Sequence, residues 1–402
     1  MSFPDKKNWA FSLPAALLLL APFNILASLA MDVYLPVVPA MPGILATTPA
    51  VIQLTLSLYM ILLGVGQIVF GPLSDRIGRR PVLLGGALLF TAASFLLSAT
   101  DSASIFLILR IAQAIGASAM LVALFATVRD AYADRPESAV VYSLLNAMLA
   151  FVPALGPILG ALIADRFGWR GLFVALGAPA MIALAWAWWR WPETAPAQVT
   201  ERGGALRRIL ASGTFWTYTL AFSAAMGSFF VFFSTAPRFL IARAGLSEFA
   251  FSLAFATAAL VMIIATRFVA ALAKKWGIAG CVRRGMALLL LGSGLLVLGQ
   301  IFLAPTFWSL MPAMWIIAVG IVVTASVTAD GALAGFGDVA GTAVAFYFCL
   351  QSLIVGLLGT AAAVLLPGDT AWPLASYAAG MAMATLVALA VLRRRERYPV
   401  RN

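Results

Sequence analysis

The sequence contains no histidine and only two cysteines, Cys281 and Cys349. Histidine is the commonest metal ligand and proton shuttle, so we expect no metal site or cofactor, and any proton transfer must use carboxylates. Both cysteines fall in or near apolar segments, which indicates packing residues and not a disulfide. An enzyme is the least favoured class, because no metal-spaced cluster or activated nucleophile is evident.

Charged residues are also scarce, at 10% of the chain, whereas hydrophobic residues make up 63% and the mean hydropathy is +1.01. A soluble domain has roughly 45–50% apolar and about 25% charged residues, so no water-soluble fold of this length could bury so much apolar surface. A bilayer removes that need, and the composition therefore predicts an integral membrane protein. The long apolar blocks favour helices over a β-barrel, whose spanning segments alternate over about ten residues.

Twelve apolar blocks follow one another, each near the roughly 20 residues that a spanning helix needs. A polar stretch leaves six blocks on either side, which is the layout of two repeated bundles. We therefore predict an all-α integral membrane fold with an N-terminal six-helix bundle at 1–191, a central cytoplasmic linker at 192–213 and a C-terminal six-helix bundle at 214–402. The expected spans are 13–38, 50–72, 81–100, 104–127, 138–164, 169–191, 214–237, 249–273, 281–303, 307–329, 338–366 and 371–392.

The first block is longer than the core of a cleaved signal peptide, about 7–15 residues, so we expect it to remain as a span. The net charge is +11, and the basic residues fall mainly in loops. With the amino terminus inside, twenty Lys and Arg residues face the cytoplasm and only Arg166, Arg170, Arg238 and Arg243 face the other side. The positive-inside rule then predicts that both termini are cytoplasmic. Such loops meet anionic lipid headgroups, so no nucleic-acid partner is expected.

Asp32, in the first predicted span, and Arg110, in the fourth, are charges placed among apolar residues of the membrane interior. A charge at that depth costs at least about 2.5–3.5 kcal/mol on insertion scales. One interpretation is a structural ion pair between them. The favoured one is a carboxylate that takes and releases a proton beside Arg110, with Gln113 one helical turn away. Asn24, two turns before Asp32, is either a hydrogen-bonding residue for a ligand or a polar link between helices.

The loop after the second block reads GPLSDRIGRRP from Gly71 to Pro81. A glycine at position 78 allows a tight turn, Asp75 can accept hydrogen bonds from an Arg or a helix end, and the arginines hold the loop at the inner face. This spacing resembles the loop signature of the major facilitator superfamily. A role in membrane orientation alone would explain the basic residues of this loop, but it would not explain the glycines or Asp75.

Further segments resemble the same family. Arg110 with Gln113 and Gly116 is similar to its fourth-helix signature. The segment 153–160, with Gly156 and Pro157, resembles the fifth-helix signature of its antiporters, where Pro and Gly let a helix bend and slide. The segment 32–36 resembles the first-helix signature of twelve-helix drug/proton antiporters. The phrases at 53–57, 125–130, 229–234 and 345–349 look like the chloramphenicol/florfenicol exporters, a group in which we expect an acid where this chain has Asn24.

The resemblance implies proton-coupled efflux of phenicol antibiotics by alternating access, by a monomer in the bacterial inner membrane. Proton coupling is expected at Asp32, Arg110 and Gln113. An apolar cavity with a few polar groups would suit a phenicol, although aromatic residues in spans more often pack or face lipid. Candidate substrate-binding residues are Asn24, Tyr59, Tyr142, Asn146, Phe229, Phe233, Tyr347 and Gln351.

Gating is expected at the inner loop and the fifth helix, although the loop charges have solvation as an alternative reading. The gating candidates are Asp75, Arg76, Arg79, Arg129, Asp130, Gly156 and Pro157. No phosphate-cradling loop is present in the sequence, which disfavours ATP as the energy source. The alternative functions are export of other drugs, or transport of a small metabolite such as a sugar or an amino acid.

Overall fold

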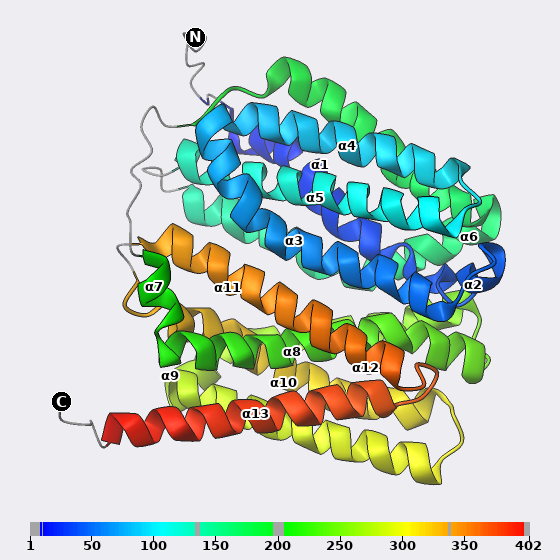
Figure 1. Cartoon of the computed structure of the whole chain (residues 1–402), viewed down its shortest axis with the longest axis vertical. Helices are drawn as coiled ribbons and strands as arrows, with labels where there is room; N and C mark the ends of the chain where they lie inside the picture. The colour runs from blue at the N-terminus through cyan, green and yellow to red at the C-terminus, as the bar shows by residue number, and fades with distance from the viewer. Residues whose placement is uncertain (1–8, 10, 133–136, 196–204, 337–338, 398–402) are drawn as a thin grey trace. The chain divides into compact units, whose positions relative to one another are not determined.

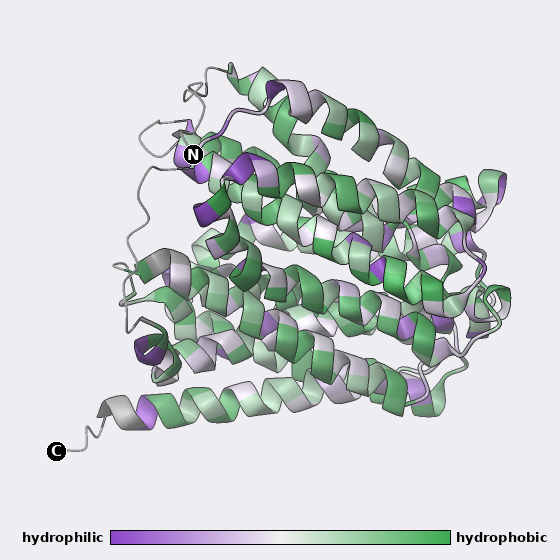
Figure 2. Ribbon diagram, turned by 45° about the horizontal axis from the view of Figure 1, so that its top comes forward, coloured by the Kyte–Doolittle hydropathy of each residue, from purple (hydrophilic) through white to green (hydrophobic). Residues whose placement is uncertain are grey.

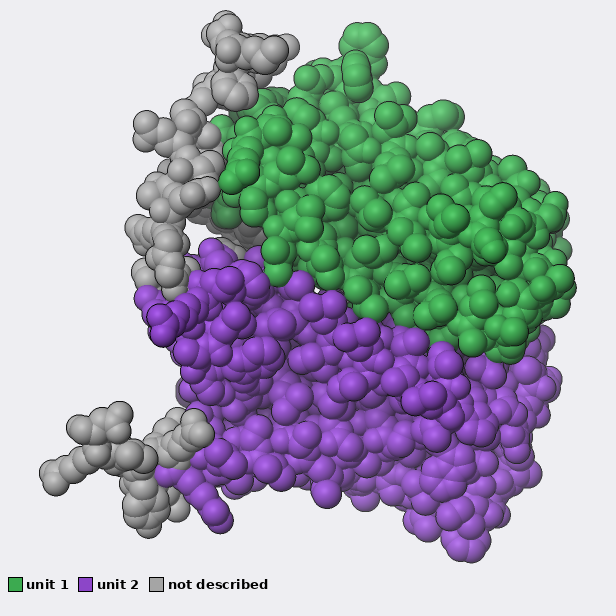
Figure 3. Space-filling model, in the orientation of Figure 1, with its two compact units in different colours: residues 1–201 green, residues 202–402 purple. Residues whose placement is uncertain are grey.

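The computed structural model describes residues 9, 11–132, 137–195, 205–336 and 339–397 (Figure 1). Within these ranges the secondary structure is helical, with short 3-10 and π-helical turns and no strand. The chain divides into two compact units, residues 1–201 and residues 202–402, which Figure 3 shows in different colours.

Unit 1 is an all-helical bundle in which the first and last helices are neighbours. Helix α1 packs against α6, α4 packs against both α5 and α6, and α3 packs against α5. Its elements are α1 (Leu13–Asp32), the 3-10 turn η1 (Leu35–Val37), α2 (Met41–Ile44), α3 (Pro49–Ile77), α4 (Arg79–Ala99), α5 (Ala103–Tyr132) and α6 (Ser138–Arg190).

Unit 2 is a second bundle, in which α8 packs against α10, α11 and α13, and α9 packs against α10 and α13. Two of its spans contain π-helical turns, η2 after α8 and η4 between α11 and α12. Its elements are α7 (Ala205–Leu210), α8 (Gly213–Pro237), η2 (Arg238–Arg243), α9 (Glu248–Phe302), α10 (Phe307–Leu333), α11 (Ala340–Ile354), η4 (Val355–Gly359), α12 (Thr360–Leu365) and α13 (Trp372–Arg397).

Ten helical stretches in the described chain are long and apolar enough to cross a membrane. Two helices are far longer than one crossing requires, since α6 has 53 residues and α9 has 55. At 1.5 Å per residue each would extend about 80 Å, against a hydrocarbon core of about 30 Å. Non-helical glycines divide both, at Gly168 in α6 and Gly277 in α9. Counted as two crossings each, they confirm the predicted all-α fold of twelve spans, six per unit.

Three glycines join consecutive spans through positive φ angles, which residues with a Cβ rarely adopt. They are Gly78 at φ 105°, Gly168 at φ 67° and Gly277 at φ 66°. The sequence around two of them is alike, because both 75–80 and 165–170 read Asp-Arg-x-Gly-x-Arg. Unit 1 thus uses the same tight connection twice, between α3 and α4 and within α6.

Large apolar side chains remain exposed on the helices, as a lipid environment allows. Figure 2 shows hydrophobic residues along most of the helical ribbon. Trp189, Phe302 and Leu365 are among the most exposed, at 82%, 76% and 81%. A water-soluble monomer rarely exposes large contiguous apolar patches, so these outward residues agree with a multi-pass membrane protein.

Small residues let the helices of unit 1 approach closely, most clearly where α4 meets α5. A Cβ built on Gly86 would lie 2.7 Å from the Ala119 Cβ and 2.8 Å from the Gly116 carbonyl oxygen. A Cβ built on the adjacent Gly85 would meet nothing within 4 Å. The two neighbouring glycines therefore form a matched pair, one at the helix contact and one away from it.

We predict that Gly86→Ala lowers the thermal stability of the purified protein in detergent, because overpacking a tight contact typically costs about 1–3 kcal/mol. Gly85→Ala is the control and should leave the melting temperature unchanged or slightly raised, since alanine favours helix. An equal loss of stability in both variants would contradict the close α4–α5 contact.

Candidate functional site

Arg110 lies about two turns into α5 and is 1% exposed. Its guanidinium carbon is 5.2 Å from the centre of the Tyr34 ring and 4.8 Å from the centre of the Tyr59 ring. Aromatic faces attract cations, and the attraction strengthens when the pair is shielded from water. The two rings, one following α1 and one from α3, therefore supply part of the environment that this buried charge needs.

Hydrogen bonds orient the same guanidinium. Arg110 Nη1 donates to the Gln113 Oε1 at 2.6 Å and to the Ala30 carbonyl oxygen at 3.1 Å. Gln113 Nε2 donates in turn to the Ser94 Oγ of α4 at 2.8 Å. The structure thus brings together Arg110 and Gln113, and links both to α1 and α4.

Asp32, at the end of α1, is buried as well, with 6% exposure. Among the described residues, no ion pair joins it to Arg110. Its Oδ1 has no hydrogen-bond partner, and neither do Nε and Nη2 of Arg110. The structural ion pair considered from the sequence is therefore not the arrangement seen. The reason is local, because the guanidinium turns to Ala30 and Gln113 while the Asp32 side chain lies against α6.

The contact between Asp32 and α6 is made at the predicted antiporter-like segment. A Cβ built on Gly156 would lie 2.5 Å from the Asp32 Cβ, and one built on Gly160 would overlap the Val33 carbonyl. Pro157, between the two glycines, lies inside the helix, where proline removes a backbone donor and favours bending. Because these two glycines have no Cβ, the end of α1 packs closely against a part of α6 that can bend.

Two predicted substrate-binding residues of unit 1 hold α1 in place. Asn24 is fully buried, and its Nδ2 donates to the Leu145 carbonyl oxygen of α6 at 3.0 Å, while its Oδ1 has no partner. Tyr59 is also fully buried, and its hydroxyl donates to the Ala27 carbonyl oxygen at 2.7 Å. Asn24 therefore makes the polar link between helices and keeps one free acceptor. The side chains of Tyr142 and Asn146 lie outside the described residues.

The predicted aromatic residues of unit 2 belong to a cluster between α8 and α9. Phe229 and Phe233 are 6.4 Å apart, and their ring centres lie 6.1 Å and 6.0 Å from that of Phe255. Neither ring is isolated on the helix surface. The structure therefore brings these two candidates together within unit 2.

The other two candidates of unit 2 lie on α11. The Tyr347 hydroxyl donates to the Thr328 Oγ1 at 3.0 Å, and its ring stacks on Phe222 at 5.0 Å between centres. Gln351, one turn further along α11, is buried, and its Nε2 has no partner. The described part of unit 2 thus offers an aromatic cluster and an unpaired side-chain amide donor.

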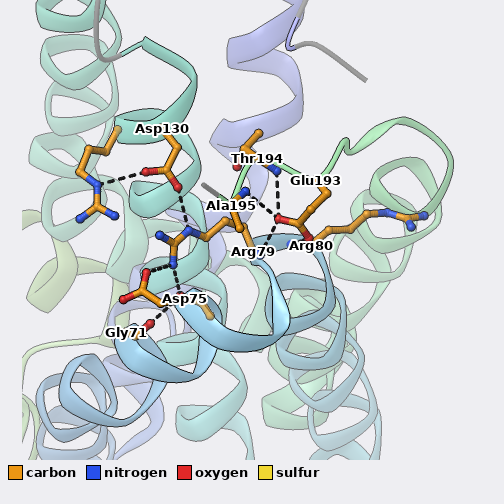
Figure 4. Close-up of polar contacts among 10 residues, drawn as sticks. Gly71, Asp75, Arg79, Arg80, Asp130, Glu193, Thr194 and Ala195 are labelled. Carbon is orange, nitrogen blue, oxygen red and sulfur yellow. Dashed lines mark hydrogen bonds and ion pairs between the residues drawn. The ribbon is translucent and has the colours of Figure 1, made fainter. Parts of the chain in front are cut away.

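Arg79 is the first residue of α4 and the centre of the polar contacts at the connection between α3 and α4, as Figure 4 shows. The segment predicted as a loop is helical on both sides of Gly78, because α3 continues to Ile77. Arg79 is 1% exposed, its Nη1 lies 2.5 Å from Asp75 Oδ1, and its Nε donates to Asp130 Oδ2 at 2.8 Å. Arg129 is more exposed and contacts the other oxygen of Asp130 at 3.2 Å. We call Asp75, Arg79 and Asp130 the Arg79 cluster. It joins the ends of α3 and α5 to the start of α4, and Arg76 lies beside it in the last turn of α3.

Three residues in these arrangements were missed from the sequence: Tyr34, Ser94 and Glu193. Tyr34 lies within the first-helix signature, but an aromatic residue at a span end gives no sign of the cation that it covers. Ser94 is one of many small polar residues in spans. Glu193 follows Trp191-Pro192 directly after α6, and its carboxylate accepts hydrogen bonds at the loop 114 residues earlier. No local pattern announces such distant partners.

The buried polar and charged groups of unit 1 come from several helices. No group of three or more His, Cys, Asp or Glu side chains in the described ranges could hold a metal ion. What unit 1 offers is a carboxylate and a guanidinium, both buried, unpaired with each other and attached to different helices. Such groups can change partners when a proton or a ligand arrives.

The family model for the Major Facilitator Superfamily matches residues 20–360. The chain is 49% identical over 381 residues to a chloramphenicol resistance protein of Pseudomonas aeruginosa, covering 94% of this chain and 90% of that protein. It is 29% identical over 238 residues to multidrug resistance protein MdtL of Shewanella oneidensis, covering 58% and 60%.

Solved structures agree on the fold. A D-xylose-proton symporter superposes with a TM-score of 0.76 at 16% identity, covering 93% of this chain and 97% of that one. A bacterial homologue of the human lysosomal transporter Spinster gives 0.71 at 16% identity, covering 95% and 96%. With the family match, the full-length relative and the twelve-span fold in agreement, this chain belongs to the Major Facilitator Superfamily and is a membrane transporter, not an enzyme.

Proposed function

We propose that this protein exports phenicol antibiotics, chloramphenicol and florfenicol, in exchange for protons. The observation that carries the proposal is the 49% identity, over 94% of the chain, to a chloramphenicol resistance protein. The proposed setting is the bacterial inner membrane, with both termini in the cytoplasm and the protein acting as a monomer. The excess of basic residues in the loops assigned to the cytoplasm supports this orientation.

The chemistry of unit 2 suits such a drug. A phenicol carries one aromatic ring, an amide and hydroxyl groups, and pockets for such ligands are mostly apolar with a few polar groups. The rings of Phe229 and Phe233 match the aromatic part. The Nε2 of Gln351 is a buried donor with no hydrogen-bond partner among the described residues. Tyr347 completes the proposed set in this unit.

Unit 1 contributes the unpaired Oδ1 of Asn24 as an acceptor for a hydroxyl or amide N–H of the drug. Because Nδ2 of the same amide holds Leu145 on α6, a drug that engages Asn24 would also act on the contact between α1 and α6. Tyr59, Tyr142 and Asn146 remain proposed binding residues. The hydroxyl of Tyr59 already donates to a backbone carbonyl of α1, so we propose that Tyr59 contacts the drug through its ring.

Proton coupling is proposed at Asp32. An ionised carboxylate buried in a span needs a partner, and Arg110 holds two unpaired donors, Nε and Nη2. Loss of a proton would draw Asp32 toward Arg110, and regaining it would release the side chain to the position seen. Since Asp32 rests on Gly156, this exchange would move the end of α1 against α6, with Pro157 as the bending point.

Gating is proposed at the cytoplasmic side, where the Arg79 cluster with Arg76 and Arg129 holds three helix ends together. Two carboxylates on one arginine give a closed, charge-compensated arrangement that must be broken for the helices to separate. In an alternating-access cycle the cluster would open and close as the transporter changes the side on which its site is accessible.

A broader drug range is the alternative, and the likeness to multidrug resistance proteins MdtL favours it. The deciding measurement is growth inhibition of a sensitive bacterium, with and without expression, across a panel. Protection against chloramphenicol and florfenicol alone supports the phenicol assignment. Protection against unrelated drugs supports the broader range, and protection against none contradicts both.

We predict that drug flux in vesicles containing the purified protein follows an imposed pH gradient, because Asp32 exchanges its proton during the cycle. In Asp32→Asn the rate of gradient-driven flux should fall at least tenfold, which corresponds to about 1.4 kcal/mol of activation free energy. Drug should still bind to this variant. Ser57→Ala, which removes a buried hydroxyl bonded within α3, serves as the control. Flux indifferent to the gradient in the parent protein would exclude proton coupling.

We also predict that Asn24→Asp makes transport more strongly dependent on pH. A protonated aspartic acid can donate to the Leu145 carbonyl as the amide does, whereas an ionised carboxylate cannot donate at all. The α1–α6 link would then form at low pH and break at high pH. Asn24→Ala removes the link at every pH and is the matched comparison. Identical pH profiles for the two variants would show that position 24 does not titrate during transport.

A further inference from the structure

The carboxylate of Glu193 is a hydrogen-bond acceptor for four backbone N–H groups. Arg79 donates to it at 2.8 Å and Arg80 at 3.2 Å, and its own neighbours Thr194 and Ala195 each donate at 2.9 Å. Figure 4 shows this carboxylate between the start of α4 and the segment that follows α6. Glu193 thus fastens the chain leaving α6 to the inner loop.

These bonds complete a helix terminus that the loop leaves unfinished. The first N–H groups of a helix have no partner within the helix, and the residue before α4, Gly78, has no side chain to accept them. Glu193 supplies that acceptor from a distant part of the chain, and its negative charge is favourable at the positive end of the α4 dipole.

The glycine before α4 is suited to this arrangement in two respects. Gly78 has φ 105°, and a Cβ at this position would overlap the carboxylate of Glu193. A further bond, from Arg80 Nη2 to the Trp188 carbonyl oxygen at 2.6 Å, ties the same turn to the end of α6. The start of α4 is therefore held against the end of α6 by both backbone and side-chain donors.

Glu193 accepts a hydrogen bond from the backbone N–H of Arg79, and the side chain of this same arginine forms the Arg79 cluster. Oε1 of Glu193 accepts from the Arg79 backbone, while the Arg79 side chain reaches Asp75 and Asp130. Fixing the backbone of Arg79 fixes the point from which its guanidinium spans α3 and α5. Without the hydrogen bond to Glu193, the backbone of Arg79 could move, and its side-chain bonds to both aspartates would be less well positioned.

We propose that Glu193 is a positioning residue for transport: by capping α4 it holds Arg79 in the geometry that closes the cluster, so that its release favours opening. The proposal rests on the gating role proposed above for the Arg79 cluster. A cap that served stability alone would change the melting temperature but not the balance between closed and open states. The test must therefore report on opening as well as on folding.

A reporter for opening is available on α5. Thr127 is fully buried, lies three residues before Asp130, and its hydroxyl has no partner. A Thr127→Cys substitution, made with Cys281→Ala and Cys349→Ala, places one shielded thiol beside the cluster. Its rate of reaction with N-ethylmaleimide in the detergent-purified full-length protein measures how often the region opens. This measurement needs neither drug nor a proton gradient.

Three further variants are compared in this parent. Glu193→Ala removes every bond of the cap, and Glu193→Gln keeps one acceptor oxygen but loses the charge and the second acceptor. The matched control is Thr194→Ala, because the Thr194 hydroxyl has no partner while its backbone N–H is retained. Size-exclusion profiles establish that each variant is folded, and Glu193→Gln decides the outcome if Glu193→Ala is not monodisperse.

We expect Glu193→Ala to raise the labelling rate about tenfold, the scale set by losing a hydrogen bond to a charged group. Drug flux should fall by a similar factor with the half-saturating drug concentration unchanged, since the drug contacts are left intact. Glu193→Gln should lie between, and Thr194→Ala should match the parent.

Unchanged labelling in a folded Glu193→Ala or Glu193→Gln variant would overturn the proposal, as would faster labelling with undiminished flux. If the parent exports no phenicol, the proposed function fails, while the labelling comparison still decides the role of Glu193. An altered half-saturating concentration with unaltered labelling would place Glu193 in drug binding instead and would also reject the positioning role.

Discussion

Unit 1 is built around the need to shelter two arginines from a medium in which an isolated charge is expensive. Arg79 and Arg110 are both about 1% exposed. Their contacts and the helices they lie on include α1, α3, α4 and α5. Arg79 also donates a backbone hydrogen bond to Glu193 in the segment that follows α6. Any helix that moved away would leave a donor or a charge unpaired, so the sheltering of these two side chains limits how the bundle can rearrange.

The two arginines meet this need in different ways. Arg79 has two carboxylates within ion-pair distance, whereas Arg110 has aromatic faces, an amide and a backbone carbonyl. A charge with its counterions in place is released only when those ion pairs are broken. One that lacks them, with a carboxylate on the neighbouring helix end, can respond directly to a proton. The contrast separates a closed cluster that must be broken to open from a buried charge whose partners a proton can change.

The sequence was sufficient for the architecture because hydropathy and span length follow from bilayer thickness. The gaps between predicted spans at 164–169 and 273–281 contain Gly168 and Gly277, where the structure breaks its two longest helices. Contacts between side chains on different helices were harder to predict from the sequence. The ion pair of Asp32 with Arg110 was only one of two readings, and a helix face does not reveal which neighbour takes a donor. Glu193 was missed because its two partners on α4 lie 113 and 114 residues away.

The surroundings of Arg110 also bear on how the protein is made. Its shelter consists of Ala30, Tyr34 and Tyr59, which all precede it in the chain, and Gln113, which lies on the same helix. During synthesis α1, Tyr34 and α3 therefore precede α5, so the groups that surround the guanidinium in the folded protein are made before the arginine itself. The order of the chain is also the order in which this buried charge needs its partners.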